Sequence, residues 1–262
     1  LPRLISGQLR LPEFEEIIDL CKKYNIKLNL TTNGSFPRKG AEGWAKLLVP
    51  ITSDIKFSWN GATKETQEKI MIGNHWERSL ENLKTLIRIR DEHAVQGGNR
   101  CRITLQLTFL ESNVHELCDV VKLAISLGVD RIKGHHLWAH FKEIENLSMR
   151  HNPEAIEKWN RVVREAKEIA TQNPLPNGKV IILENIEELD TGATVDLMPD
   201  GVCPFLGKEA WINTEGKFSP CCAPDELRKS LGNFGNLYDN TMEEIWGGKA
   251  YQNLQKTYLS HP

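Results

Sequence analysis

The sequence lacks the features of several large protein classes. No apolar run approaches the roughly 18 residues that a membrane-spanning helix needs. No signal peptide opens the chain, so we expect a protein of the reducing cytoplasm. The 33 Lys and Arg residues are scattered among 35 Asp and Glu residues and form no basic run. We therefore expect neither nucleic acid nor a membrane as a partner.

Repeats and low-complexity segments are also absent, and the rest of the composition is ordinary for a globular protein. Hydrophobic residues make up 40% of the chain and charged residues 26%. A chain of 262 residues is long enough for one large domain and a small one. The first residue is Leu1 and not methionine, so we expect the natural amino terminus to be missing.

Short apolar runs alternate with amphipathic helical stretches along most of the chain. Strands are predicted at residues 26–31, 54–59, 102–110, 131–138 and 179–184. Helices are predicted at residues 12–24, 41–48, 64–72, 76–94, 114–127 and 154–171. This alternation predicts a parallel sheet, either open or closed into a barrel. Ligands of such folds bind beyond the carboxyl ends of the strands.

The predicted strand ends are mostly small or polar, which suits a polar ligand that the backbone approaches closely. They are Ser6-Gly7, residues 31–34, residues 58–61, residues 108–113 and His135-His136. Alternation along a strand turns one of the two histidines toward the cavity as a substrate or cofactor contact. The alternative for each histidine is a packing role, and polar strand ends are also simply where chains turn.

The block from Cys203 to Cys222 is the most informative stretch. Cys203 is followed by twelve residues, Gly216, four residues and the pair Cys221-Cys222. Two short predicted strands, at residues 210–213 and 217–219, form a hairpin that brings Cys203 close to the pair. Thiolates gathered at a tight turn suit an iron–sulfur cluster or a zinc ion. The alternative is a set of buried or disulfide-paired cysteines.

The three remaining cysteines have a structural interpretation. Cys21 lies on the apolar face of a predicted helix, and Cys118 lies inside another. Cys101 begins a predicted strand. We expect none of these three thiols to be a ligand.

The cysteine block resembles the start of a SPASM or twitch domain. The resemblance rests on the Cys–Gly–Cys spacing, on Leu-Gly-Asn at residues 231–233 and on Met-Glu-Glu-Ile-Trp at residues 242–246. Such domains follow the barrel of radical S-adenosylmethionine (SAM) enzymes and hold an auxiliary iron–sulfur cluster. The resemblance implies that Cys203, Cys221 and Cys222 ligate that cluster. It also implies that the remaining ligands lie beyond Pro262.

The rest of the chain resembles the radical SAM barrel piece by piece. Residues 11–33 resemble the helix and strand that follow the family's GGEP motif, and residues 54–70 resemble the strand that usually ends in Ser-Leu-Asp-Gly. Residues 103–117 and 127–137 resemble the last barrel units. Carried over by position, the implied SAM contacts are Ser6, Gly7, Thr32, Asn33, Ser58 and Asn60.

The chain departs from the family pattern in three places. The CxxxCxxC triplet that binds the SAM-cleaving cluster is absent, and we expect it upstream of Leu1. The GGEP position has the residues Ser6-Gly7-Gln8-Leu9. The aspartate of Ser-Leu-Asp-Gly is replaced by Asn60, which keeps hydrogen bonding and loses charge.

These patterns predict an α/β protein. We expect residues 1–190 to form a partial parallel (β/α)6 radical SAM barrel that lacks its first unit. We expect residues 191–262 to form a small, truncated α+β domain of the SPASM or twitch type.

The resemblance implies that the parent protein is a radical SAM oxidoreductase or maturase. In the family, a 4Fe-4S cluster takes an electron from a donor such as a flavodoxin or ferredoxin and cleaves SAM reductively. The resulting 5′-deoxyadenosyl radical abstracts hydrogen from a peptide or small-molecule substrate. Neither the catalytic residues nor the substrate follow from the sequence. We expect this fragment alone to be inactive.

Two alternatives belong to other functional classes. One is a non-catalytic iron–sulfur or zinc scaffold on a degenerate barrel, which the altered Ser6-Gly7-Gln8 run would favour. The other is an ordinary lyase or isomerase barrel without a cluster. A CxxxCxxC triplet upstream would separate the enzyme from the scaffold, and analysis of iron and sulfide would separate both from the ordinary barrel.

Overall fold

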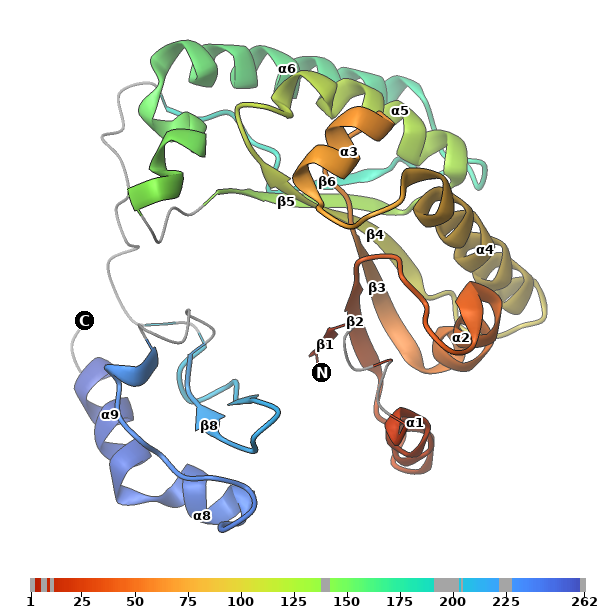
Figure 1. Ribbon diagram of the computed structural model, residues 1–262. Helices are drawn as coiled ribbons and strands as arrows, with labels where there is room; N and C mark the ends of the chain where they lie inside the picture. The colour runs from red at the N-terminus through yellow and green to blue at the C-terminus, as the bar shows by residue number, and fades with distance from the viewer. Residues whose placement is uncertain are drawn as a thin grey trace. The chain divides into compact units, whose positions relative to one another are not determined.

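The chain folds into two compact units, which span Leu1–Val195 and Asp196–Pro262 (Figure 1). The computed structural model describes residues 3–5, 9, 12–137, 142–190, 203, 205–221 and 228–259. Each unit has its own hydrophobic core, so each is described by itself.

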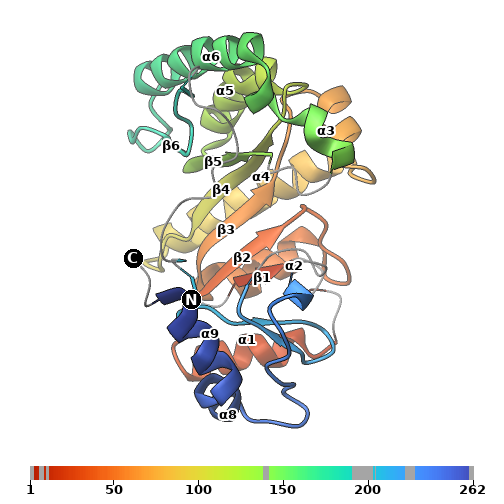
Figure 2. The same ribbon diagram turned by 90° about the vertical axis from the view of Figure 1, so that its left-hand side faces the viewer.

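The larger unit is built on one six-stranded parallel sheet in which the strands follow one another in sequence order. The strands are β1 (Arg3–Ile5), β2 (Leu28–Thr32), β3 (Thr52–Ser58), β4 (Arg102–Phe109), β5 (Arg131–His136) and β6 (Ile182–Glu184). Figure 2 shows them side by side in this order. The predicted α/β fold with a parallel partial barrel is therefore confirmed.

Helices cover the outer side of the curved sheet (Figure 1). They are α1 (Phe14–Lys23), α2 (Gly40–Leu48), α3 (Lys64–Ile70), α4 (Trp76–Val95), α5 (Leu117–Leu127) and α6 (Pro153–Gln172). Short 3₁₀ turns occur at η2 (Val49–Ile51), η3 (Val114–Glu116), η4 (Lys142–Leu147) and η5 (Met149–His151). The predicted helix at 114–127 thus begins as the turn η3, and only its later part is α-helical.

Local chemistry sets where these helices begin and end. The Asn152 side chain caps α6 by accepting hydrogen bonds from two backbone N–H groups of the first turn, and Pro153 follows at the first helical position. Gly128 ends α5 with a φ of 80°, a left-handed conformation that glycine adopts without a steric cost.

The two faces of the sheet differ sharply in polarity. Successive residues of a strand point to opposite faces. The outward face packs under the helices and is apolar, with buried Leu28, Leu30, Ile55, Phe57, Ile103, Leu105, Leu107 and Ile132. Strand register groups polar residues on the inner face: Asn29, Thr31, Asp54, Lys56, Ser58, Thr104, Gln106, Thr108, Arg131, Lys133, His135 and Glu184. Barrels that fill their own interior use mainly Val, Ile and Leu there, so this interior suits a polar ligand.

Arg131 is the centre of a charged network on the inner face. It is 7% exposed, and its Nε donates to Thr104 Oγ1 at 3.0 Å. Its guanidinium also binds the carboxylates of Asp54 and Glu184, and Thr104 Oγ1 donates to Asp54 Oδ1 at 2.8 Å. Lys133 is a further donor to Glu184, and this hydrogen bond is the main cause that lowers the pKa of Glu184. The network joins β3, β4, β5 and β6.

His136 ends β5 in the helix layer. Its ring lies 5.4 Å from the Phe109 ring and 4.7 Å from the Trp159 ring of α6, measured between centroids. Its buried Nδ1 has no hydrogen-bond partner within the described residues. Burial, with nearby Arg150 and His135, lowers the pKa of His136 to about 4. The imidazole is therefore neutral at physiological pH.

Within its described residues, the smaller unit holds an antiparallel pair of strands and the helices α8 and α9. The strands are β7 (Trp211–Ile212) and β8 (Phe218–Ser219), and the helices are α8 (Met242–Gly247) and α9 (Lys249–Leu259). Phe218 and Tyr251 are almost fully buried at its centre, with ring centroids 5.2 Å apart. Gly216 has a φ of 74° at the turn that precedes β8, a conformation that other residues rarely adopt.

The packing of His136 predicts a pH-dependent stability. Its pKa falls from 6.5 to about 4 on folding, so the unfolded chain binds more protons between these values. Above pH 6.5 the imidazole is neutral in both the folded and the unfolded chain, and the protein keeps its full stability. As the pH falls toward 4, only the unfolded chain takes up the proton, so the free energy of unfolding decreases. We expect a loss of about 2 kcal/mol by pH 5.

Urea unfolding at pH about 7.5 and about 5 measures this loss. His136→Phe keeps the ring contacts and removes the titrating group, so its stability should fall less between the two pH values. An unchanged difference between wild type and variant at both pH values would show that His136 does not titrate in this range.

Candidate functional site

Ser58 ends β3 at the edge where ligands of parallel sheets bind. It lies beside Gln106 in the strand register and belongs to the inner face of the sheet. The next residue, Trp59, is fully buried, and its ring lies 5.1 Å from that of Trp76 in α4. The Ser58 side chain therefore has the position that a contact with a ligand in the interior requires, while Trp59 belongs to the helix layer.

Asn60 joins the ends of β3 and β4. Its Oδ1 accepts a hydrogen bond from the Thr108 backbone N–H at 2.8 Å. Its backbone N–H donates to Gln67 Oε1 at 2.7 Å, and its carbonyl accepts from Asn113 Nδ2 at 3.0 Å. The Asn60 side chain thus fixes the loop beside Ser58.

Glu116, the last residue of the turn η3, binds the same loop. Its carboxylate is 6% exposed and accepts from the backbone N–H groups of Ala62 and Thr63 at 2.5 and 3.1 Å. It also accepts from the hydroxyls of Thr63 and Thr66 at 2.8 and 2.5 Å. Burial alone would raise the pKa of Glu116, but these hydrogen bonds together hold it below its usual range. The sequence alone indicates no such role for Glu116, because its partners lie 50 to 54 positions earlier in the chain.

Thr32 and Asn33 shape the turn after β2. Thr32 is 1% exposed, alternates with inward-facing Thr31, and its Oγ1 accepts from the Gly34 N–H at 3.2 Å. Asn33 Oδ1 accepts from Ser35 N at 3.1 Å and from Ser35 Oγ at 2.7 Å. The structure therefore uses the Thr32 hydroxyl within the turn, and the register places Thr31 beside Lys56 on the inner face.

The two histidines of β5 lie on opposite faces. His135 is exposed on the inner face, where its Nε2 lies 3.2 Å from Gln106 Nε2. Partial burial and the neighbouring Lys133 lower the pKa of His135. His136 lies among the aromatic rings of the helix layer. Of the two predicted substrate contacts, the structure brings His135 to the interior.

The smaller unit carries the candidate cluster thiols. Cys203 is exposed, and Cys221 is half-buried two residues after β8. Ser219 Oγ donates to the Cys221 carbonyl at 3.0 Å. Thiols are the ligands of iron–sulfur clusters, so both fit a cluster by donor type.

Part of the predicted site lies outside the described residues, namely Ser6, Gly7 and Cys222. Within the described ranges, no three His, Cys, Asp or Glu side chains come together as a metal site. The structure therefore describes two of the three predicted cluster thiols, those of Cys203 and Cys221.

The other described cysteines differ in their environment. Cys101 is fully buried, Cys118 is 7% exposed and Cys21 is 6% exposed in the core of the larger unit. Burial raises the pKa of Cys101 to about 12 and that of Cys118 to about 11. These thiols stay protonated, whereas a metal ligand must be a thiolate.

Among the described helices, none combines the length and apolar character that crossing a bilayer requires.

Sequence comparisons give two matches. Residues 203–262 match the family model of SPASM, an iron-sulfur cluster-binding domain. A stretch of 86 residues, 32% of this chain, is 34% identical to the S-adenosyl-L-methionine-dependent tRNA 4-demethylwyosine synthase of Oryza sativa subsp. japonica. The matched stretch spans 12% of that relative's length.

Structural comparisons match almost the whole chain. SuiB of Streptococcus suis bound to the precursor peptide SuiA superposes with a TM-score of 0.66 at 13% identity, covering 97% of this chain and 55% of SuiB. Native anSMEcpe with bound AdoMet and the Cp18Cys peptide gives a TM-score of 0.62 at 17% identity, covering 94% of this chain and 66% of that one. At 13% and 17% identity, these structural matches show a shared fold. The chain spans little more than half the length of SuiB.

The cysteine hairpin that sequence reasoning singled out falls within the SPASM match, and the polar-lined parallel sheet has the fold of the radical SAM barrel. Residues 203–262 thus match the SPASM iron-sulfur cluster-binding domain, and the chain has the fold of SuiB and anSMEcpe.

Proposed function

We propose that this chain is the barrel and SPASM portion of an enzyme that cleaves SAM reductively and abstracts a hydrogen atom from a peptide. The observation that carries the proposal is the SPASM match over residues 203–262, which contains the two described hairpin thiols. An ordinary lyase or isomerase barrel has no use for such a domain. When bound, SAM and its 4Fe-4S cluster supply the one-electron chemistry.

In this proposal the inner face of the sheet binds and orients the reactants. The Ser58 hydroxyl donates to or accepts from the SAM nucleoside at the end of β3. Asn60 and Glu116 hold the adjoining loop, so Ser58 keeps its position without rearrangement when SAM binds. His135, neutral at physiological pH, presents ring nitrogens to the substrate from the end of β5. Ser6 and Gly7 complete the SAM site as proposed from their positions in the sequence, whereas the side chains of Thr32 and Asn33, expected from the sequence to contact SAM, shape the turn after β2 instead.

Two comparisons support a peptide as the substrate class. SuiB is bound to a precursor peptide and anSMEcpe to the Cp18Cys peptide, and both share this fold. The rice relative acts on tRNA, but the formal charge of this chain is −2 and its cations are dispersed, which disfavours a nucleic-acid substrate. A small molecule remains the second candidate substrate.

The SPASM unit would hold the auxiliary cluster through Cys203, Cys221 and Cys222. Its electrons would come from a flavodoxin or ferredoxin. Thiolate ligands require reducing conditions, so we propose a cytoplasmic location.

SAM cleavage tests the proposed reaction. The 262 residues contain no CxxxCxxC triplet, so with SAM and dithionite they should release no 5′-deoxyadenosine. A parent chain that includes such a triplet should release it under anaerobic conditions, as measured by liquid chromatography and mass spectrometry. Absence of 5′-deoxyadenosine from an iron-loaded parent chain would rule out the reaction class.

Iron content tests the cluster ligands. In the parent chain after anaerobic reconstitution, Cys203→Ala and Cys221→Ala should each lower bound iron and sulfide, because each removes a thiolate. Cys118→Ala is the matched control, since that thiol is buried and protonated. Equal iron content in all three variants and the wild type would contradict the assignment.

SAM affinity tests the position of Ser58. Loss of one neutral hydrogen bond costs roughly 0.5 to 1.5 kcal/mol, so Ser58→Ala should weaken SAM binding about two- to twelvefold in the parent chain. Trp59→Ala should instead lower the free energy of unfolding by about 3–5 kcal/mol through a core cavity. Calorimetric titration and thermal unfolding of both variants measure the two effects. Normal SAM affinity in Ser58→Ala, together with lost affinity and normal stability in Trp59→Ala, would reverse the assignment of the two faces.

A further inference from the structure

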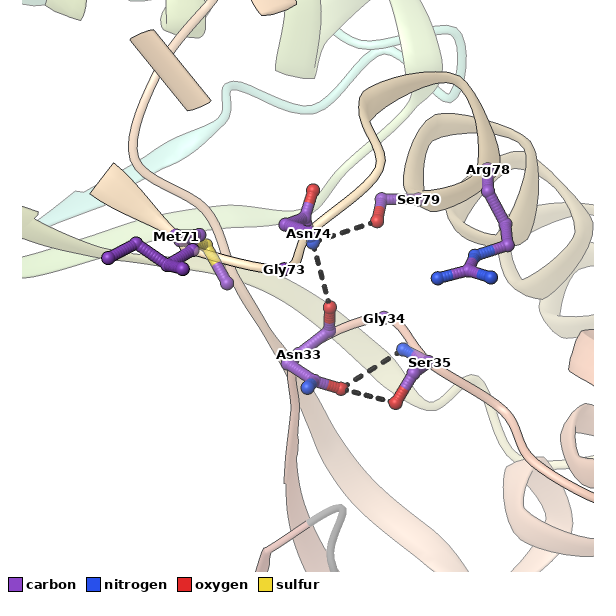
Figure 3. Close-up of a pocket in the computed structure, with 9 residues that line it drawn as sticks. Asn33, Gly34, Ser35, Met71, Gly73, Asn74, Arg78 and Ser79 are labelled. Atoms are coloured by element: carbon purple, nitrogen blue, oxygen red, sulfur yellow. Dashed lines mark hydrogen bonds between the residues drawn. The ribbon is translucent and has the colours of Figure 1, made fainter. Parts of the chain in front are cut away.

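A pocket lies at the carboxyl end of β2, where two separate segments of the chain meet (Figure 3). One is the loop that contains Asn33, Gly34 and Ser35, and the other runs from Met71 to the first turn of α4. Its volume is about 160 Å³. A cavity of about 150 Å³ binds benzene, so this pocket can hold a group the size of an amino-acid side chain.

The two segments are fixed to each other. Asn74 Nδ2 donates to the Asn33 carbonyl at 3.3 Å and to Ser79 Oγ at 2.9 Å, as Figure 3 shows. Asn82 Nδ2 donates to the Gly34 carbonyl at 2.8 Å. These contacts link positions about forty residues apart, so the pocket is formed before any ligand binds.

Gly34 belongs to the wall of the pocket for a steric reason. Its φ is +81°, and a Cβ atom there would lie 2.8 Å from Phe57 Cε1. Phe57 is an outward-facing residue of β3. The pocket therefore borders the helix layer, whereas Ser58 and Gln106 face the barrel interior.

Arg78 gives the pocket a positive charge. Figure 3 shows its guanidinium extending from α4 toward the loop of Ser35. Within the described residues no ion pair engages Arg78, and the adjacent Glu77 is bound to Lys64 at 2.8 Å. The first turn of α4 adds no free positive potential, because the Glu68 carboxylate already accepts a hydrogen bond from the Trp76 N–H at 2.9 Å, so the positive charge of the pocket comes from Arg78.

The lip of the pocket is apolar. Ile72 is 95% exposed, and Met71 lies beside it. A ligand that pairs with Arg78 and also packs on Ile72 and Met71 carries a negative charge next to apolar groups. A single arginine without a second cation suits one carboxylate and not a dianionic phosphate, and guanidinium binds carboxylate with two parallel hydrogen bonds.

We propose that this pocket binds the carboxylate of an acidic residue in the peptide substrate, with Arg78 as the residue that determines this specificity. The proposal rests on the proposed function in its choice of a peptide as the ligand. Apolar residues that flank the acidic one would lie on Ile72 and Met71.

Two blocked tripeptides serve as probes, acetyl-Ile-Glu-Ile-amide and acetyl-Ile-Gln-Ile-amide. They have nearly the same shape and differ in charge. Titration into the isotope-labelled protein, followed by NMR, should show the Glu peptide binding about tenfold more tightly than the Gln peptide. The shifted signals should include those of residues 33–35 and 71–79.

The variant Arg78→Gln should remove the preference for the Glu peptide, and Arg78→Lys should restore part of it. Arg164→Gln is the matched control, because Arg164 is an exposed arginine of another helix and pairs with Glu188. This control should keep the full preference. Arg78 is itself exposed, so its variants should fold like the wild type, which thermal unfolding measures.

Three results would overturn the proposal. These are equal affinity for the two peptides, a preference that survives Arg78→Gln, and inorganic phosphate or SAM displacing the Glu peptide from the pocket. The titration involves no turnover, so its outcome is separate from that of the 5′-deoxyadenosine assay. A chain that cleaves no SAM could still show the preference, and an active enzyme could lack it.

Discussion

The pairing of Arg131 with Asp54 and Glu184 is the interaction on which the arrangement of the barrel interior depends. A buried charge without a partner costs several kcal/mol, so these groups fix which strand residues lie opposite one another. A slip of one residue in β5 would exchange Arg131 for Ile132 and place a charge among the helices. The same register puts Ser58, Gln106 and Lys133 in one row toward the ligand edge. The position of every proposed ligand contact on the inner face follows from this network.

A second layer of hydrogen bonds holds the loops above that row. Asn60, Asn113 and Glu116 come from two different loops and bind mainly backbone groups, so they define loop shape and not merely side-chain position. Glu116 also occupies the amino-terminal end of α3, where a carboxylate is favoured by the helix dipole. The rim of the barrel is therefore preorganised on the β3 and β4 side. Asn74 has the corresponding function between the loop after β2 and the start of α4.

Periodicity in the sequence predicted the order of strands and helices and the parallel sheet, because burial of one face determines both. It also predicted that His135 and His136 point to opposite faces. The roles of individual polar residues depend on contacts between distant segments, which periodicity does not contain. The bonds from Ala62 and Thr63 to Glu116 are an example, as is the use of the Thr32 hydroxyl within its own turn. The cysteine block could be recognised in the sequence because its residues are close together in the chain. The pocket at Arg78 could not, because it forms between two segments that are far apart in the sequence and share no pattern.

The contrast between the two groups of cysteines bears on how the protein responds to oxygen. Cys101 and Cys118 are shielded, and as neutral thiols they react slowly with peroxide or alkylating reagents. The accessible Cys203 has no such protection. Oxidative damage in air would therefore begin in the small unit and leave the folded barrel intact. A preparation handled aerobically could keep its secondary structure and melting behaviour while its hairpin thiols are already modified, so a folded protein is no guarantee of one that can still take up iron.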